Sequence, residues 1–181
     1  MSRLSRLVLA AGGKAALKGQ TQVESTNWSG YVVTGSGFTQ VSGDWNEPTA
    51  SCGSATSLAA FWIGIDGYSS PTVEQAGTLI ECYGGTAYQY TWWEMYPTND
   101  IQVVGDTVAS GDAIVALITR KGTSYTLKIT DSTHPANSFK TTQTCADCDN
   151  SSAEWIAEAP TGSGAVPSSS DLDHDRHRAR C

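Results

Sequence analysis

Two polar side chains in strand-like segments could together hydrolyse an amide bond. Gln75 lies in the run 72–81 and Glu154 in the run 152–158. A carboxylate can take a proton from water, and a neutral amide can donate hydrogen bonds to the oxyanion of a tetrahedral intermediate. If the two side chains face one groove, this chemistry needs no metal, serine or cysteine.

Three further segments accompany this pair. They are Asn27-Trp-Ser-Gly-Tyr31, Phe61-Trp-Ile-Gly-Ile-Asp-Gly67 and Tyr90-Thr-Trp-Trp-Glu-Met-Tyr-Pro97. In this order, the five segments resemble the glutamic peptidase (eqolisin) family over about residues 27 to 160. Any one segment alone would be weak evidence, and the resemblance is specific because all five occur together. The resemblance implies an acid-acting endopeptidase with a protein or peptide substrate and no cofactor or metal.

The resemblance also implies a role for each matching side chain. Glu154 would act as general base on water and Gln75 would hold the oxyanion, and the residues that line or support the substrate groove would be Trp62, Asp66, Trp92 and Glu94. A glutamate base must be ionised before attack and protonated afterwards, so an ordinary pKa of about 4.3 would suit acid operation.

Alternation of apolar and polar residues predicts the elements that position these side chains. The expected strands are 28–33, 59–66, 72–82, 87–96, 112–119, 124–131, 138–144 and 152–159, and the turns between them include 84–85, 97–100, 121–122 and 134–137. Many short strands at this spacing indicate an all-β fold, an antiparallel β-sandwich with little helix. The resemblance implies the same architecture, a two-sheet, concanavalin-like jelly-roll.

The same alternation predicts which way the candidate side chains point. Trp62, Gly64 and Asp66 share one face of their strand, so Asp66 is expected to look outward while the other face packs in the core. Trp92 and Glu94 share a face of theirs. A strand that lines a groove has this pattern, and so does an aromatic ladder on a surface.

Composition and charge limit the classes of function. The chain has 181 residues, enough for one domain, with 39% hydrophobic and 16% charged residues and a net charge of -7. Most cations lie near the two ends, which leaves an acidic body that repels phosphate backbones, so no nucleic-acid binding is expected. An acidic surface is also typical of soluble proteins in general. No run approaches the roughly 20 apolar residues that span a membrane.

Five cysteines raise the question of pairing, because an odd number cannot all pair within one chain. Cys52 and Cys82 could form a disulfide, and Cys145 and Cys148 could close a small loop. A CxxC pair can also be redox-active or bind zinc, but no second CxxC, nearby histidine or βαβ pattern accompanies it. We therefore interpret Cys145 and Cys148 as a structural disulfide or as free thiols. If the other four cysteines pair, Cys181 has no partner within the chain.

The two ends of the chain differ from its body. We expect residues 1–22 to be a leader or disordered segment, 23–161 to be the β-sandwich domain and 162–181 to be a disordered polar tail. Basic residues precede an apolar stretch at the N-terminus that is shorter than the core of a signal peptide, so a signal peptide and a propeptide remnant both stay open there. A secreted, extracellular protein is expected. Relatives in the family continue with further strands after the glutamate segment, so we interpret the chain as truncated and expect an exposed edge or apolar groove.

Other functions remain open on the sequence alone. A carbohydrate-active or carbohydrate-binding sandwich could use Glu94 and Glu154, but it would have no required role for Gln75. An inactive truncated family member, or a sandwich whose glutamates are merely solvated, would carry the same segments. The motifs Asp-Thr-Gly, GxSxG and HExxH are absent, and His134, the one histidine of the body, is expected in a surface turn. A monomer is expected.

Overall fold

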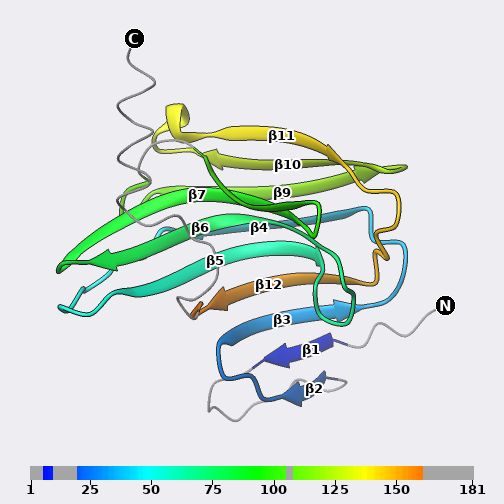
Figure 1. Cartoon of the computed structure of the whole chain (residues 1–181), viewed down its shortest axis with the longest axis horizontal. Coiled ribbons are helices and arrows are strands. Elements are labelled where there is room, and N and C mark those ends of the chain that lie inside the picture. Colours follow the sequence, from blue (N-terminus) through cyan, green and yellow to red (C-terminus); the bar gives the residue numbers. More distant parts are fainter. Residues whose placement is uncertain (1–5, 10–19, 105–107, 161–181) are drawn as a thin grey trace.

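Strands are the main elements in the described part of the chain. The computed structural model describes residues 6–9, 20–104 and 108–160 (Figure 1). The strands are β1 (Arg6–Leu9), β2 (Gln20–Val23), β3 (Trp28–Thr34), β4 (Gln40–Asn46), β5 (Ser57–Asp66), β6 (Val73–Tyr83), β7 (Thr86–Tyr96), β8 (Asn99–Val104), β9 (Ala113–Lys121), β10 (Ser124–Asp131), β11 (Phe139–Thr144) and β12 (Ser152–Glu158). Within this part of the chain the single helical element is a 3-10 turn, η1 (Pro135–Asn137), so the expected scarcity of helix is confirmed.

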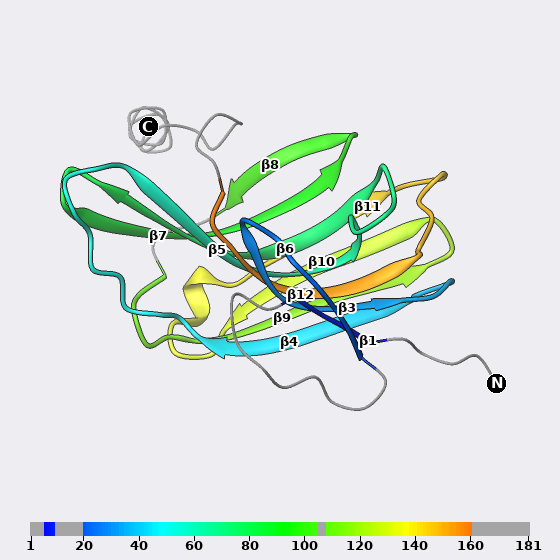
Figure 2. The same ribbon diagram turned by 90° about the horizontal axis from the view of Figure 1, so that it is seen from below.

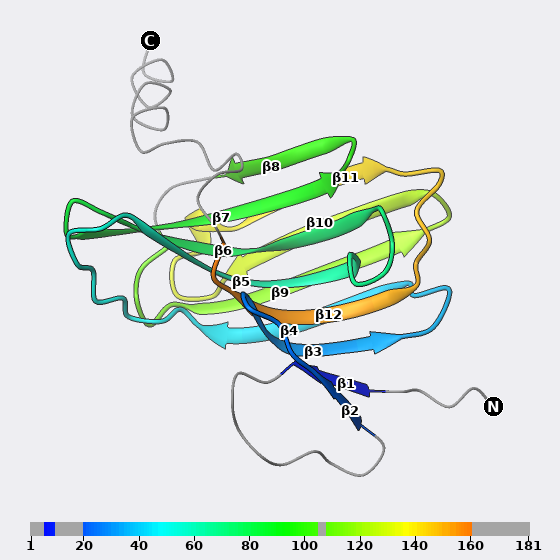
Figure 3. The same ribbon diagram turned by 60° about the horizontal axis from the view of Figure 1, so that its bottom comes forward.

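The strands form two sheets that pack face to face. The larger sheet has the order β2-β1-β3-β12-β5-β6-β7-β8 and the smaller one the order β11-β10-β9-β4. Figure 3 shows the larger sheet in this order, from β8 at the top to β2 at the bottom. Neighbouring strands are antiparallel except for β1 and β2. The predicted antiparallel β-sandwich is confirmed.

The main core lies between the two sheets. Alternate apolar residues of β5 point into it, among them the fully buried Ile63 and Ile65, and meet the buried Ile114 and Ile118 of β9. Burying each such side chain contributes roughly 1.5–3 kcal/mol. Figure 2, turned to show the molecule from below, shows β5, β6 and β7 bending along their length beside β9 and β10 of the other sheet.

The opposite, outer face of the larger sheet carries a second buried cluster. Its members are Val32, Ala60, Trp62, Leu79, Tyr90, Trp92 and Ile156. Gly77 on β6 makes room for this cluster, because a Cβ there would come within 2.6 Å of the Trp62 Cβ. With both faces covered, β5 and β6 do not show the clean inside-outside alternation of a half-exposed strand.

Four strands were not among those predicted: β1, β2, β4 and β8. β8 begins at Asn99, inside the predicted turn 97–100, because the turn takes only two residues. In β4, Val41 and Trp45 point inward, but Gly43 stands between them and weakens the apolar period. Gly43 is required by packing, since a Cβ would lie 3.0 Å from the Ile63 side chain.

β4 is an edge strand of the smaller sheet. The larger sheet extends beyond β12 through β3 and β1. A groove of about 270 Å³ lies beside β4, and apolar side chains such as Phe61, Trp155 and the half-exposed Tyr31 line it. The expectation that an exposed edge or apolar groove marks the place of missing strands stays a prediction.

Two disulfides tie connecting segments to the sheets. One joins Cys52 to Cys82, and the other joins Cys145 to Cys148. The predicted leader 1–22 lies partly, and the predicted tail 162–181 wholly, outside the described residues. No helix in the described ranges is long and apolar enough to cross a membrane.

Candidate active site

A row of side chains crosses the larger sheet on its outer face. The strand register places Glu154 of β12 opposite Gly64 of β5, Gly64 opposite Gln75 of β6, and Gln75 opposite Glu94 of β7. Directly opposite residues in neighbouring strands point to the same face. The sheet therefore brings Glu154, Gln75 and Glu94 to one face, with Gly64 between the first two.

The glycine leaves a gap between the candidate acid and the candidate amide. Neighbouring strands lie about 4.8 Å apart, so the backbones of Glu154 and Gln75 are separated by roughly 10 Å. A Cβ at Gly64 would lie 3.6 Å from the Gln75 Cβ and 3.1 Å from the Trp62 ring. Any larger residue would fill the space where a water or a peptide group could meet both side chains. The sequence placed Gly64 on this face but gave it no role.

The Glu154 carboxyl is fully buried and only partly hydrogen-bonded. The Ser152 hydroxyl donates to Oε1 at 3.0 Å, whereas Oε2 has no hydrogen-bond partner among the described residues. Gly67, with a φ of 105°, brings the chain close to this oxygen, because a Cβ there would lie 3.3 Å from Oε2. An unpaired carboxyl oxygen in a buried position is uncommon in proteins and marks Glu154 as a candidate functional group.

Burial raises the pKa of Glu154 to about 8, and the nearby Asp66 carboxylate adds to the shift, while the Ser152 hydroxyl and the nearby Tyr68 backbone amide oppose it. The predicted ordinary pKa of about 4.3 is therefore wrong for Glu154, because burial removes water from the carboxyl and disfavours its charged form. At acidic pH Glu154 is protonated before substrate binds.

Gln75 and Glu94 contact each other directly. The Gln75 Nε2 donates to the Glu94 Oε2 in a short hydrogen bond. Burial raises the pKa of Glu94, the bond from Gln75 opposes the rise, and Asp100 and Glu158 increase it. Glu94 thus fixes the orientation of the Gln75 amide, whose second N–H and carbonyl oxygen stay available for other partners.

Two tryptophans form a second row beside the first. Trp62 of β5 stands opposite Gly77, and Gly77 stands opposite Trp92 of β7. The Trp62 Nε1 donates to Glu158 at 3.1 Å, and its ring meets Trp28 edge-on at a centroid distance of 5.3 Å. The Trp92 Nε1 is buried without a hydrogen-bond partner in the described structure. It is a second unpaired polar atom on this face.

Asp66 does not look outward, so that expectation is wrong. Its φ of 64° turns it out of the strand alternation, and the carboxylate is fully buried. It accepts hydrogen bonds from the backbone N–H groups of Asn150 and Ser151, each at 2.7 Å, and from the Ser151 hydroxyl at 2.8 Å. Asp66 therefore holds the segment that leads into β12 and supports Glu154 through the backbone.

This arrangement can bind a polar group and move a proton. Glu154 offers a protonated carboxyl and Gln75 offers an amide, with a gap between them at Gly64. A glycosidase pair would need Glu94 and Glu154 to act on one bond, with carboxyl groups about 5 to 10 Å apart. Gln75 lies between these two glutamates and binds Glu94, so the geometry does not favour that pair.

Two clusters elsewhere in the described residues have metal-ligand side chains. In the first, Glu74 lies beside Cys145 and Cys148, but the two sulfurs are joined to each other. The second holds Asp112, Asp131 and His134. Its carboxylates already accept protein donors, including the His134 Nδ1 at 2.9 Å from Asp112 and backbone N–H groups on Asp131. We assign no metal to either cluster.

Known proteins resemble this chain in sequence and in fold. The model of the peptidase A4 family matches residues 26–171. Scytalidopepsin B of Scytalidium lignicola is 32% identical in an alignment of 162 residues that covers 84% of this chain, and aspergillopepsin-2 of Aspergillus niger is 30% identical in an alignment of 168 residues that covers 78% of it. A crystal structure of scytalido-glutamic peptidase with a transition state analog inhibitor superposes with a TM-score of 0.62 and 26% identity, over 73% of this chain and 64% of that one.

The match covers only part of these relatives. The chain spans 60% of the length of scytalidopepsin B and 59% of that of aspergillopepsin-2.

Proposed function

Because the chain belongs to the peptidase A4 family, the glutamic peptidases or eqolisins, we propose that it is an endopeptidase that uses Glu154, Gln75 and a water molecule. The observation that carries the proposal is the shared outer face of the two side chains, which the strand register places on either side of Gly64. The substrate is a protein or peptide, secretion places the enzyme outside the cell, and the chain works as a monomer.

In the proposed mechanism, Glu154 supplies a proton before it accepts one. The protonated carboxyl donates to the carbonyl oxygen of the scissile amide, which makes the carbon more electrophilic. Water then attacks that carbon and gives a proton to the ionised Glu154, which at this point acts as general base. In the last step Glu154 protonates the leaving nitrogen, the C–N bond breaks, and a hydroxyl of the intermediate returns a proton to Glu154.

Gln75 stabilises the intermediate in this scheme. Its amide, oriented by Glu94, donates a hydrogen bond to the oxygen on which charge develops. The donor is fixed before substrate binds, so no reorganisation is needed during the reaction. Trp62 and Trp92 pack in the second buried cluster on the same face of the sheet and support the pair from there.

An assay on an unfolded protein substrate tests the proposal. We expect activity at acidic pH that is unaffected by a chelator. Glu154→Gln keeps the shape but removes the proton transfer, and should lower kcat by about 10²–10⁴-fold. Gln75→Ala should lower kcat by about 10²–10³-fold and change KM much less.

Matched variants separate chemistry from folding. Glu24→Gln and Gln40→Ala make the same changes at exposed positions outside the candidate active site and should leave turnover unchanged. Circular dichroism and thermal melting must show each variant folded. Activity that requires metal, or that survives Glu154→Gln, would refute the mechanism. A folded chain without activity would identify it as a degenerate member of the family.

A further inference from the structure

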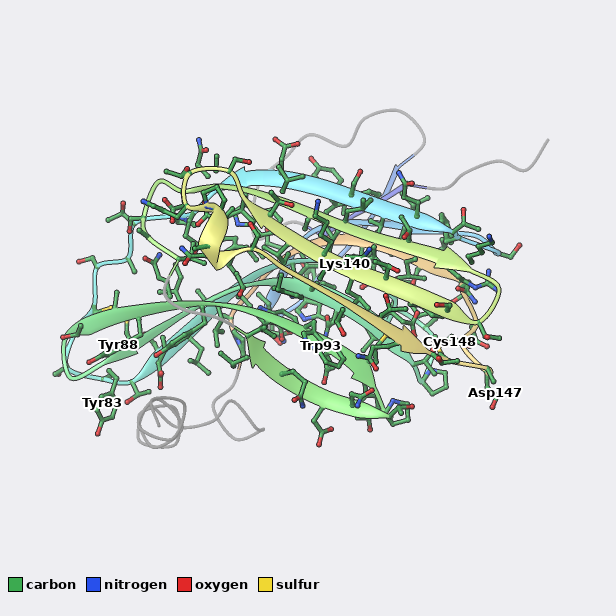
Figure 4. The ribbon with its side chains drawn as sticks, turned by 90° about the horizontal axis from the view of Figure 1, so that it is seen from above. Tyr83, Tyr88, Trp93, Lys140, Asp147 and Cys148 are labelled. Carbon is green, nitrogen blue, oxygen red and sulfur yellow. A yellow bond between two sulfur atoms is a disulfide. The ribbon has the colours of Figure 1, made fainter. Side chains whose placement is uncertain are left out.

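The segment between β11 and β12 contains a small disulfide loop near the candidate site. We call residues 145–151 the CxxC loop; it begins with Cys145-Ala-Asp-Cys148 and ends one residue before β12. The two cysteines are half-buried, and the two residues between them are exposed. Figure 4 shows Cys148 and Asp147 together at one end of the sandwich, at the opposite end from Tyr83 and Tyr88.

A buried carboxyl lies against one sulfur of this disulfide. The Glu74 Oε1 is 2.8 Å from the Cys148 Sγ, and Glu74 is fully buried on the inner face of β6. A disulfide sulfur carries no hydrogen, so any proton in this contact must come from Glu74. Burial and the neighbouring Asp66 carboxylate raise the pKa of Glu74 to about 9, and Arg120 opposes the rise, so the proton is present at neutral pH.

The same loop is tied to the strand that carries Glu154. The Asn150 Nδ2 donates to the Cys148 carbonyl oxygen at 2.6 Å, and the Asn150 N–H donates to Asp66 at 2.7 Å. Asn150 has a left-handed φ of 54° and accepts a hydrogen bond from the Tyr125 hydroxyl at 2.6 Å. A shift of Cys148 would therefore disturb Asn150, the next residues and the start of β12.

We propose that the Cys145–Cys148 disulfide is a thiol-exchange site for dithiol reductants, and that its opening loosens the start of β12 and so lowers the activity of Glu154. The second half of this inference rests on the proposed peptidase function. The first half stands on the contact between Glu74 and Cys148 and on the exposed residues between the two cysteines.

The exchange proceeds in two balanced steps. A thiolate of the reductant attacks the Cys145 Sγ, a new S–S bond forms there, and the Cys145–Cys148 bond breaks with its electron pair on Cys148. Glu74 gives its proton to this leaving thiolate. The second thiol of the reductant then displaces Cys145, which takes up a proton, and the reductant leaves as a cyclic disulfide. The protein gains two electrons and two protons, and Glu74 is reprotonated from solvent.

The second disulfide provides an internal control. Cys82 is buried at 7% exposure, and neither Cys52 nor Cys82 has a hydrogen bond to a carboxyl among the described contacts. Without a proton donor at the leaving sulfur, and with one sulfur covered, this bond should react more slowly with the same reductant.

The test of the site uses the oxidised full chain and dithiothreitol at neutral pH, followed by alkylation and peptide mapping. We expect Cys145 and Cys148 to be alkylated before Cys52 and Cys82, and Glu74→Gln, which keeps the shape but has no acidic proton, to slow this reduction at least about tenfold. Earlier reaction of Cys52 and Cys82, or an unchanged rate in Glu74→Gln, would overturn the proposed site.

Hydrogen exchange tests the coupling without relying on activity. After reduction, amides of residues 150–158 should exchange faster, while those of β9 and β10 should not change. In the peptidase assay, the reduced chain and the variant Cys145→Ser/Cys148→Ser should lose at least about tenfold in kcat, since a misplacement of about 1 Å can cost about 100-fold. Reoxidation should restore the wild type only. Unchanged exchange in β12 would refute the coupling, whereas changed exchange in an inactive chain would refute only the peptidase function.

Discussion

The buried carboxyl of Glu74 should make the free energy of unfolding fall as the pH rises. The carboxyl is fully buried between the sheets, and burial and Asp66 raise its pKa from 4.5 to about 9. Its Oε2 has no hydrogen-bond partner in the described structure and its Oε1 contacts the Cys148 Sγ, so the buried site favours the neutral, protonated carboxyl. Below about pH 4.5 the group is protonated in the folded and the unfolded chain alike, so its full contribution to stability is present there.

Above that pH the unfolded chain loses the proton first. The free energy of unfolding then falls by about 1.4 kcal/mol for each pH unit, until the folded carboxyl ionises near pH 9. Between pH 4.5 and pH 7 this amounts to about 3 kcal/mol, a large share of the stability of a domain. Glu74→Gln keeps the volume and a hydrogen-bond donor but does not titrate.

Urea unfolding at pH 4 and pH 7 measures the effect. Relative to the wild type, Glu74→Gln should be close to neutral at pH 4 and more stable by about 3 kcal/mol at pH 7. Glu24→Gln, at an exposed carboxyl, should show no such difference. If the free energy of unfolding depends on pH equally in the wild type and in Glu74→Gln, the reasoning is refuted, because Glu74 would then be ionised inside the fold.

Three further outcomes are expected at the candidate site. Gly64→Ala should lower kcat/KM at least about tenfold while the chain stays folded, because the added methyl enters the gap between Glu154 and Gln75; steady-state kinetics and melting measure the two effects. Asp66→Asn should lower kcat by loosening the start of β12, visible as faster hydrogen exchange at Ser151 and beyond. The pH profile should fall as Glu154 ionises near pH 8; a rate that instead rises toward pH 8 would show that the ionised form starts the reaction.

The sequence predicted the sandwich because most strands carry a clear period of two. The strand of Tyr125, Leu127 and Ile129 is an example, since all three are fully buried in the core. β4 was missed because Gly43 interrupts its apolar positions, and that glycine is explained only by its distance to Ile63 across the core. A packing constraint between sheets leaves no local pattern in the sequence.

The candidate site was predictable in part for the same reason. Gln75, Glu94 and Glu154 belong to recognisable segments, and alternation along each strand indicates their faces. The alignment of the three with Gly64 depends on the register between four strands, which the sequence of one strand does not contain. The pKa of Glu154 and the inward turn of Asp66 depend on burial by distant segments, so an ordinary carboxyl and a regular strand were the wrong assumptions.

Strand β6 places two different properties on adjacent residues. Gln75 points to the outer face opposite Gly64, whereas Glu74 stands opposite Ile65 and Met95 on the inner face. A slip of one residue would exchange them, which would put an amide in the core and a carboxyl in the groove. Because the register separates the two side chains, catalysis and pH-dependent stability should be separable by mutation. Gln75→Ala should lower turnover and leave the contribution of Glu74 to the pH dependence of unfolding in place, and Glu74→Gln should remove that contribution and leave turnover unchanged in the oxidised chain.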